Sequence, residues 1–153
     1  MQVLQLAGAL EAAGNDLARP AGQSAARWQV LAAVEDEPAT VAAVARLLAL
    51  TRQSVQRVAD ALAVDGLVRY VDNPAHQRAK LAELTPAGLQ ALRTIQTAQA
   101  EWARRSAVGL DAAALDATRR TLAEIAARLG RNEPEQLRHK QSQGYPSEPT
   151  TVV

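Results

Sequence analysis

The chain has 153 residues, of which 48% are hydrophobic and 22% charged, and its formal net charge at pH 7 is +1. This length and apolar content are sufficient for one folded domain with a buried core, while a near-neutral charge neither favours nor excludes a nucleic-acid partner. Cysteine is absent, which excludes disulfides, thiolate metal sites and a cysteine-based redox switch.

The sequence shows no feature of an exported or membrane-bound protein. Residues 1–20 lack a basic leader and contain Glu11 and Asp16. No segment approaches the roughly 18 uninterrupted apolar residues that a membrane-spanning helix needs. We therefore expect a cytoplasmic protein without a membrane partner.

The N-terminal segment has the spacing of an amphipathic helix over residues 1–18. Its apolar residues recur every three or four positions, which places them in one stripe along the helix: Val3, Leu6, Leu10, Ala13 and Leu17. Such a stripe is expected to pack against another helix.

A second helix is expected after the breakers Pro20 and Gly22. Ser24 is a suitable N-cap, and the periodic pattern runs to about residue 34. The residues expected to face inward are Trp28, Leu31 and Val34. The acidic loop over residues 35–38 ends this helix.

Two further helices follow on a very short connection. Thr40 is expected to cap a helix over residues 41–48, and Thr51 to cap a longer helix that reaches Asp65. This is the spacing of a helix-turn-helix. In the first of the two helices, the residues expected inward are Val44, Leu47 and Leu48, with Arg46 outward.

The longer helix has two different faces at about 100° per residue. The apolar face consists of Val55, Val58, Ala59 and Leu62. The opposite face is polar and consists of Gln53, Gln56, Arg57 and Asp60, with Arg52 and Ser54 beside it near the N-terminus. The first turns of this polar face lie where a recognition helix meets bases.

A two-stranded wing is expected after Gly66 ends that helix. Residues 67–71 have the β-branched and aromatic content of a strand, and residues 73–77 supply a polar turn. Residues 79–84 return as the second strand, with Leu81 and Leu84 expected to pack toward the core.

Two more helices complete the folded part. Thr85 and Pro86 form an N-cap and N1 pair, so a helix begins there and continues to about residue 107. After Gly109, Asp111 caps a last helix with a second apolar stripe: Leu115, Thr118, Leu122, Ile125 and Leu129. Residues 131–153 are rich in Pro, Gln and Ser and are expected to form a flexible tail, with a short helix around residues 134–140.

Residues 44–92 contain an uninterrupted order of expected elements: a helix, a turn, a second helix and a wing. Within this order, Gly66-Leu67-Val68 precedes the wing, Arg78 lies in it, and the sequence LTPAG follows at residues 84–88. Together with RWQVLAAV over residues 27–34 and the last striped helix, this order resembles the MarR-type transcriptional regulators. The resemblance implies a mainly α fold with a small β-wing. It also implies an obligate dimer with interlocked terminal helices, and a small-molecule cleft between the dimer region and the DNA-reading region.

The same resemblance divides the chain into four parts. Residues 1–22 are expected to form an N-terminal dimerisation helix, and residues 23–84 the winged helix-turn-helix. Residues 85–130 are expected to form C-terminal dimerisation helices, and residues 131–153 the tail.

Within this frame, double-stranded DNA is the expected partner. Arg reads guanine and Gln reads adenine by bidentate hydrogen bonds, so Gln53, Gln56 and Arg57 are the base-contact candidates, while Arg52 and Ser54 are expected to hold phosphate. Residues 44–80 contain six basic and three acidic residues, a local balance of +3. The other DNA-binding candidates are Arg46, Asn73, His76, Gln77, Arg78 and Lys80. An ordinary solvated helix face is the alternative interpretation of the polar residues.

The wing departs from the family pattern Asp-Pro-x-Asp-Arg-Arg, because residues 73–78 read NPAHQR. Gln77 replaces the arginine expected in the minor groove, which predicts a weaker or pH-dependent wing contact. Arg78 aligns with an arginine that usually braces the wing, so bracing and direct DNA contact are both open. His76 is either a solvated turn residue or a proton switch. Ala49 stands where the family often has glycine, and we expect a slightly different turn there.

Trp28 and Trp102 are the candidates for an effector site, since aromatic side chains suit apolar pockets, although both are also suitable core residues. No cofactor and no metal site is expected.

Three classes of function remain open. The first is a ligand-responsive repressor that binds a pseudo-palindromic operator as a homodimer. The second is a winged-helix interaction module without sequence-specific DNA binding. The third is an enzyme, which the sequence disfavours because only His76 and His139 are available as histidine bases and no nucleophile or phosphate loop accompanies them.

Overall fold

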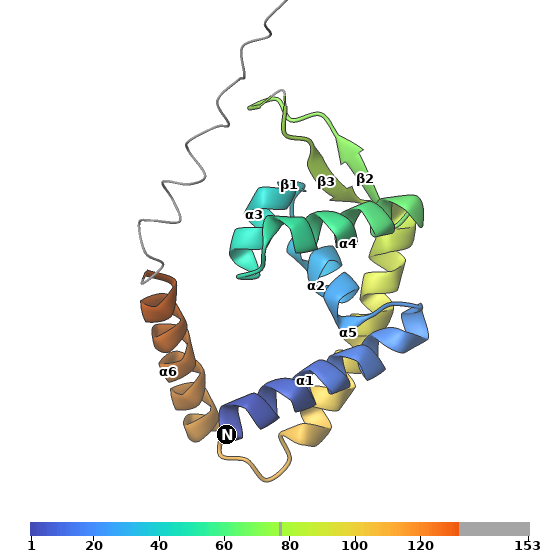
Figure 1. The fold of residues 1–153 in the computed structure, drawn as a ribbon. Coiled ribbons are helices and arrows are strands. Elements are labelled where there is room, and N and C mark those ends of the chain that lie inside the picture. The colour runs from blue at the N-terminus through green and yellow to red at the C-terminus, as the bar shows by residue number, and fades with distance from the viewer. Residues whose placement is uncertain (77, 132–153) are drawn as a thin grey trace, which may run out of the picture. The chain divides into compact units, whose positions relative to one another are not determined.

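The computed structural model describes residues 1–76 and 78–131, without the side chains of residues 129–131. Gln77, the expected tail beyond residue 131 and the expected helix around residues 134–140 therefore lie outside the described residues. The elements in chain order (Figure 1) are α1 (Gln2–Ala18), the 3-10 helix η1 (Arg19–Ala21), α2 (Ala25–Ala33), β1 (Ala39–Thr40), α3 (Val41–Leu47), α4 (Arg52–Val64), β2 (Val68–Val71), β3 (Leu81–Leu84), α5 (Pro86–Ser106) and α6 (Ala112–Arg131).

Residues 1–106 form one compact unit, and α6 belongs to a second unit that begins at Ala107. The fold is mainly helical with a small antiparallel sheet, as the sequence predicts. Among the described helices, none combines the length and apolar character required to cross a membrane.

The expected helix caps are present. In each case a side-chain oxygen accepts a hydrogen bond from the backbone N–H three residues later, which satisfies one donor that the first turn leaves free. The N···O distances lie between 2.8 and 3.3 Å at Ser24, Thr40, Thr51, Thr85 and Asp111.

The core of the first unit lies between α2, α3, α4, the sheet and α5. Its buried side chains include Leu31, Val44, Leu62, Val68 and Leu92. The apolar face of α4 supplies Val55, Ala59 and Leu62 to this core, and Val58 packs against it half-buried. The predicted inward face of α4 is therefore confirmed, and the rotation of the helix about its axis is fixed.

Two predictions of side-chain direction are wrong. Leu47 was expected inward but is 69% exposed, because α3 ends at this residue and Leu48 packs against the core instead. Leu81 and Leu84 cannot face the core together, since side chains in a strand alternate between its two faces. Ala82 is the buried residue of β3, and Leu84 is the leucine that packs against the core.

The sheet contains a third strand, β1, which the sequence analysis missed. The strand order is β1-β3-β2, with Ala39 opposite Ala82 and Val68 opposite Leu84 in antiparallel pairs. A strand of two residues is too short to show a period of two, so it leaves no signal in the sequence. In Figure 1 strands β2 and β3 lie beside α4.

The connection between α3 and α4 has the left-handed backbone that glycine favours, although alanine occupies it. Ala49 has a φ of 53°, and the N–H of Leu50 donates to the carbonyl of Ala45 at 2.9 Å. This hydrogen bond closes α3 as a glycine-containing turn would. The expectation of a different turn is therefore wrong, and alanine accepts the strained conformation.

The start of α5 is fixed to the start of the wing. The Thr85 hydroxyl donates to the carbonyl of Gly66 at 2.7 Å, and the Thr85 N–H donates to the carbonyl of Leu67 at 3.1 Å. Gly88 is buried at this junction, and a Cβ atom added there would lie 2.0 Å from the Leu67 carbonyl oxygen. The wing and α5 thus approach each other at backbone distance.

Replacing Gly88 by alanine tests this junction. The added methyl group must displace a backbone carbonyl, so we expect Gly88→Ala to lower the free energy of unfolding by about 1–3 kcal/mol in a denaturant titration. Gly8→Ala is the matched control, because nothing lies within 4 Å of the added Cβ in that helical position. The control is expected to be neutral or stabilising by up to about 1 kcal/mol. Equal midpoints for Gly88→Ala and the unchanged chain would show that the junction is looser.

Candidate nucleic-acid interface

The outward face of α4 is accessible over its first two turns. Arg52, Gln53 and Arg57 are exposed, while Ser54 and Gln56 are half-buried. This exposure follows from the core, because burying Val55, Ala59 and Leu62 leaves the opposite side of the helix to solvent. The structure therefore brings the predicted base-contact and phosphate-contact residues of α4 together on one helix end.

The cations in and around α4 divide into paired and unpaired groups. Arg69 of β2 donates to Glu83 of β3 at 2.6 Å, and Arg27 of α2 donates to Asp65 at 2.5 Å. For five exposed basic residues the described part of the chain contains no carboxylate at ion-pair distance: Arg46, Arg52, Arg57, Arg78 and Lys80. Unpaired cations are the ones available to bind phosphate.

Gln56 takes part in a closed hydrogen-bond network that the sequence analysis did not predict. Its Nε2 atom lies 2.8 Å from Asp60 Oδ1 and 3.0 Å from the Tyr70 hydroxyl. The Tyr70 hydroxyl donates to the same Asp60 oxygen at 2.7 Å. Strand β2 of the wing is therefore linked to α4 by a side-chain triangle of Gln56, Asp60 and Tyr70.

Part of this triangle has a signal in the sequence. Gln56 and Asp60 are four residues apart and therefore neighbours on one helix face. The contribution of Tyr70 depends on where β2 packs against α4, which local spacing does not indicate.

The environment of Tyr70 raises the pKa of its hydroxyl to about 12 from an ordinary value of 10.0. The largest cause is burial, which disfavours the phenolate, and the hydrogen bond to Asp60 and the negative charge of Asp60 act in the same direction. Tyr70 is therefore a neutral hydrogen-bond donor throughout the physiological range.

The wing turn is held by Asn73. Its side-chain oxygen accepts from the N–H of Ala75 at 3.0 Å, and its carbonyl accepts from the N–H of His76 at 3.1 Å. Asn73 is half-buried, whereas His76, Arg78 and Lys80 are exposed. The structure thus gives Asn73 a turn-forming role and leaves the three other described wing candidates accessible.

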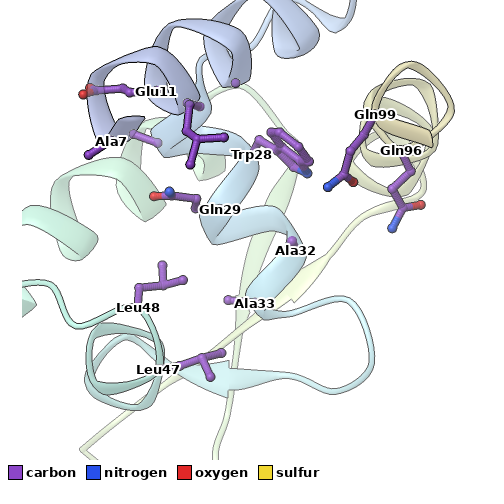
Figure 2. A pocket seen from close by; sticks show the side chains of 14 residues that line it. Ala7, Glu11, Trp28, Gln29, Ala32, Ala33, Leu47, Leu48, Gln96 and Gln99 are labelled. Carbon is purple, nitrogen blue, oxygen red and sulfur yellow. The ribbon is translucent and has the colours of Figure 1, made fainter. Parts of the chain in front are cut away.

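A pocket of about 780 Å³ lies in the first unit between α1, α2, the end of α3 and α5. Trp28 lines it, and in Figure 2 its ring points toward Gln99. Trp102 is half-buried but is not part of the wall, so the two tryptophans do not share this pocket. The exposed Leu47 belongs to the wall, which gives that side chain an apolar surface outside the core.

The pocket wall is apolar with a few amides and one ionisable group. Glu11 is the only charged side chain among the residues that line it, and the amides come from Gln29, Gln96 and Gln99. The Gln96 amide nitrogen already donates to both carboxylate oxygens of Glu35, at 3.0 and 2.8 Å. Among the described residues, no group of three or more histidines or carboxylates is arranged to hold a metal.

Comparisons with known proteins identify the same architecture. A family model described as MarR family matches residues 21–79. A protein from Mycobacterium tuberculosis that carries no assigned function is 40% identical over 132 residues, which cover 86% of this chain and 92% of that protein.

Solved structures match the fold closely. MarR from Escherichia coli, as a mutant in complex with operator DNA, has a TM-score of 0.74 at 18% identity and covers 81% of this chain and 90% of that one. CouR from Rhodococcus jostii, bound to p-coumaroyl-CoA, has a TM-score of 0.74 at 22% identity, covering 82% and 89%. The winged-helix fold is thus shared with DNA-binding regulators.

The state of Tyr70 can be measured by its ultraviolet absorbance. In a Tyr145→Phe variant, which leaves one tyrosine, we expect phenolate absorbance to rise with a midpoint near pH 12 in the folded protein. The raised pKa contributes stability that is complete below pH 10 and is lost as the pH rises through 12. Asp60→Ala is expected to lower the midpoint, and a midpoint of 10 before that substitution would contradict the network.

Proposed function

The chain belongs to the MarR family of transcription regulators, and we propose that it is a sequence-specific repressor that binds a pseudo-palindromic operator as a homodimer and responds to a small molecule. The observation that carries the proposal is the outward face of α4, which presents unpaired cations and amides beside a wing. Members of this family are regulators and not enzymes, and we propose the same for this chain, acting in the cytoplasm.

The DNA contacts are assigned by side-chain chemistry and position. Arg57 and Gln53 are exposed on α4 and have the donor patterns that read guanine and adenine in the major groove. Arg52 and Ser54 lie in the first turn of α4, where the positive end of the helix dipole favours phosphate. The remaining DNA-binding candidates are Arg46, Asn73, His76, Gln77, Arg78 and Lys80, and Arg78 can brace the wing instead of contacting DNA.

Two exposed apolar stripes, one on α1 and one on α6, support the homodimer. Within its own unit, neither stripe is covered by other described residues. In α1 the exposed fractions of Val3, Leu6 and Leu10 are 77%, 57% and 51%. In α6 those of Leu115, Leu122 and Ile125 are 43%, 56% and 48%. Monomeric proteins rarely expose apolar patches of this length. We therefore assign residues 1–22 and 85–130 to dimerisation and residues 23–84 to DNA binding.

The pocket is proposed as the effector site, with Trp28 in its wall and without Trp102. It joins the first helix of the helix-turn-helix, through Leu47 and Leu48, to α1 and α5. A ligand that binds one arrangement of these helices better than another shifts the population toward it. Since operator half-sites lie about 34 Å apart, a small change in the separation of two α4 helices weakens binding. The wall contains Glu11 and no described cation, which favours neutral or cationic apolar ligands.

Substitutions in α4 test the DNA contacts. We expect Arg57→Ala to weaken operator binding by roughly 5- to 150-fold in a gel-shift titration and to relax the preference at one base position, because a base contact is lost. Arg52→Ala is expected to weaken binding equally on all sequences and to reduce the salt slope by about one, because a phosphate contact is lost.

Arg93→Ala is the matched control, since Arg93 is an exposed arginine of α5, outside the helix-turn-helix and the wing. If Arg57→Ala leaves affinity and sequence preference unchanged, α4 is not the reading helix. Weak binding without sequence preference in the unchanged protein would favour the alternative of a winged-helix interaction module.

The dimer can be tested on α6 by light scattering. We expect Ile125→Asp to convert the dimer to a monomer at micromolar concentration, because it places a carboxylate within an apolar interface. Ala127→Asp introduces the same charge on the opposite face of the helix and is expected to leave the dimer mass unchanged. A monomer before substitution, or a dimer that tolerates Ile125→Asp, contradicts the proposal.

A further inference from the structure

Asp60 shares the outward stripe of α4 with the residues assigned to the bases. At about 100° per residue, Gln53, Arg57 and Asp60 lie within an arc of about 60°, opposite the buried side of the helix. Arg57 and Asp60 are both exposed. A molecule that meets this face therefore meets a carboxylate as well as a guanidinium.

The Asp60 carboxylate is held by one of its two oxygens. Its Oδ1 atom accepts from the Tyr70 hydroxyl at 2.7 Å and lies 2.8 Å from Gln56 Nε2, so donors from β2 and from the preceding turn of α4 fix it. Within the described part of the chain, Oδ2 accepts no hydrogen bond and no cation lies at ion-pair distance from Asp60. Since the side chain is exposed, Oδ2 is left to solvent or to a ligand.

A fixed carboxylate on a surface that faces DNA has few favourable partners. It repels phosphate, and it repels the O6 and N7 atoms of guanine and the O4 atom of thymine, which are all acceptors. The N–H donors of the major groove are the amino groups at cytosine N4 and adenine N6. Adenine places the acceptor N7 beside N6, whereas cytosine presents N4 without an acceptor on the same base. Cytosine is therefore the base that suits Asp60 best.

We propose that Asp60 is a specificity-determining residue that accepts from cytosine N4 and disfavours guanine and thymine at the same operator position. The proposal rests on the proposed function, since it assumes that α4 enters the major groove. Side chains three residues apart on a helix are about 5–6 Å from each other at Cβ, and successive base pairs are about 3.4 Å apart. The cytosine is therefore expected within about two base pairs of the guanine assigned to Arg57.

The experiment is a selection of bound duplexes from a random pool, repeated for variants. With the unchanged protein we expect cytosine to be enriched at one such position of each half-site. Asp60→Asn keeps the size of the side chain but replaces the carboxylate by an amide, which reads adenine. The ratio of cytosine to adenine at this position is then expected to fall by roughly 5- to 150-fold, while the preference at the position of Arg57 is retained.

Further variants separate base reading from other roles of Asp60. Asp60→Ala, a helix-favouring change at an exposed position, is expected to abolish the cytosine enrichment as well. Tyr70→Phe removes the link to the wing but leaves the carboxylate with its Gln56 partner, so the enrichment is expected to persist. Asp72→Asn removes a negative charge from an exposed residue that follows β2 and is expected to leave the base preferences unchanged.

Three outcomes contradict the proposal. If Tyr70→Phe loses the enrichment as fully as Asp60→Ala, Asp60 only braces the wing. If Asp60→Asn strengthens binding equally on all sequences, the carboxylate acts only through its charge. A motif that lacks the cytosine leaves α4 as the reading helix and overturns this proposal alone, whereas a pool with no enriched motif overturns the proposed function, and this proposal with it.

Discussion

The rotation of α4 about its own axis is the constraint on which the site depends. Val55, Ala59 and Leu62 are each at most 1% exposed and lock one face of the helix into the core. Since the side chains of a helix share one rigid backbone, burying these residues fixes where Arg52, Gln53 and Arg57 point. The direction of the proposed DNA-reading face is thus a consequence of apolar packing on the opposite side.

The wing is positioned by two further contacts that act at its base. Thr85 and Gly88 hold the first turn of α5 against the carbonyls of Gly66 and Leu67, at backbone distance. Tyr70 and Asp60 join β2 to α4 with hydrogen bonds between side chains. Because both contacts lie near the root of the hairpin, they connect α4, the wing and α5 to one another and fix the position of the proposed DNA-binding surface.

The arginines of the first unit fall into two groups, those that form ion pairs within the fold and those that are free to bind another molecule. Arg27 and Arg69 are engaged with Asp65 and Glu83, where they hold elements of the fold together. The exposed arginines of α3 and α4 have no such partner among the described residues, so they remain available for phosphate or bases. This division explains how a chain with a net charge of only +1 presents a basic surface at one place.

Local patterns in the sequence determined the elements. Each cap, from Ser24 to Asp111, depends on a side chain and an N–H three residues away, and the apolar face of α4 depends on a period of 3.6 residues. These interactions are complete within about one turn of chain, so the order of residues is sufficient to predict them. Only the tertiary structure decided the outward position of Leu47, the pairing of β1 with β3, and the triangle of Gln56, Asp60 and Tyr70. Each of these depends on which distant segments pack together, and the spacing of residues along the chain does not predict long-range packing.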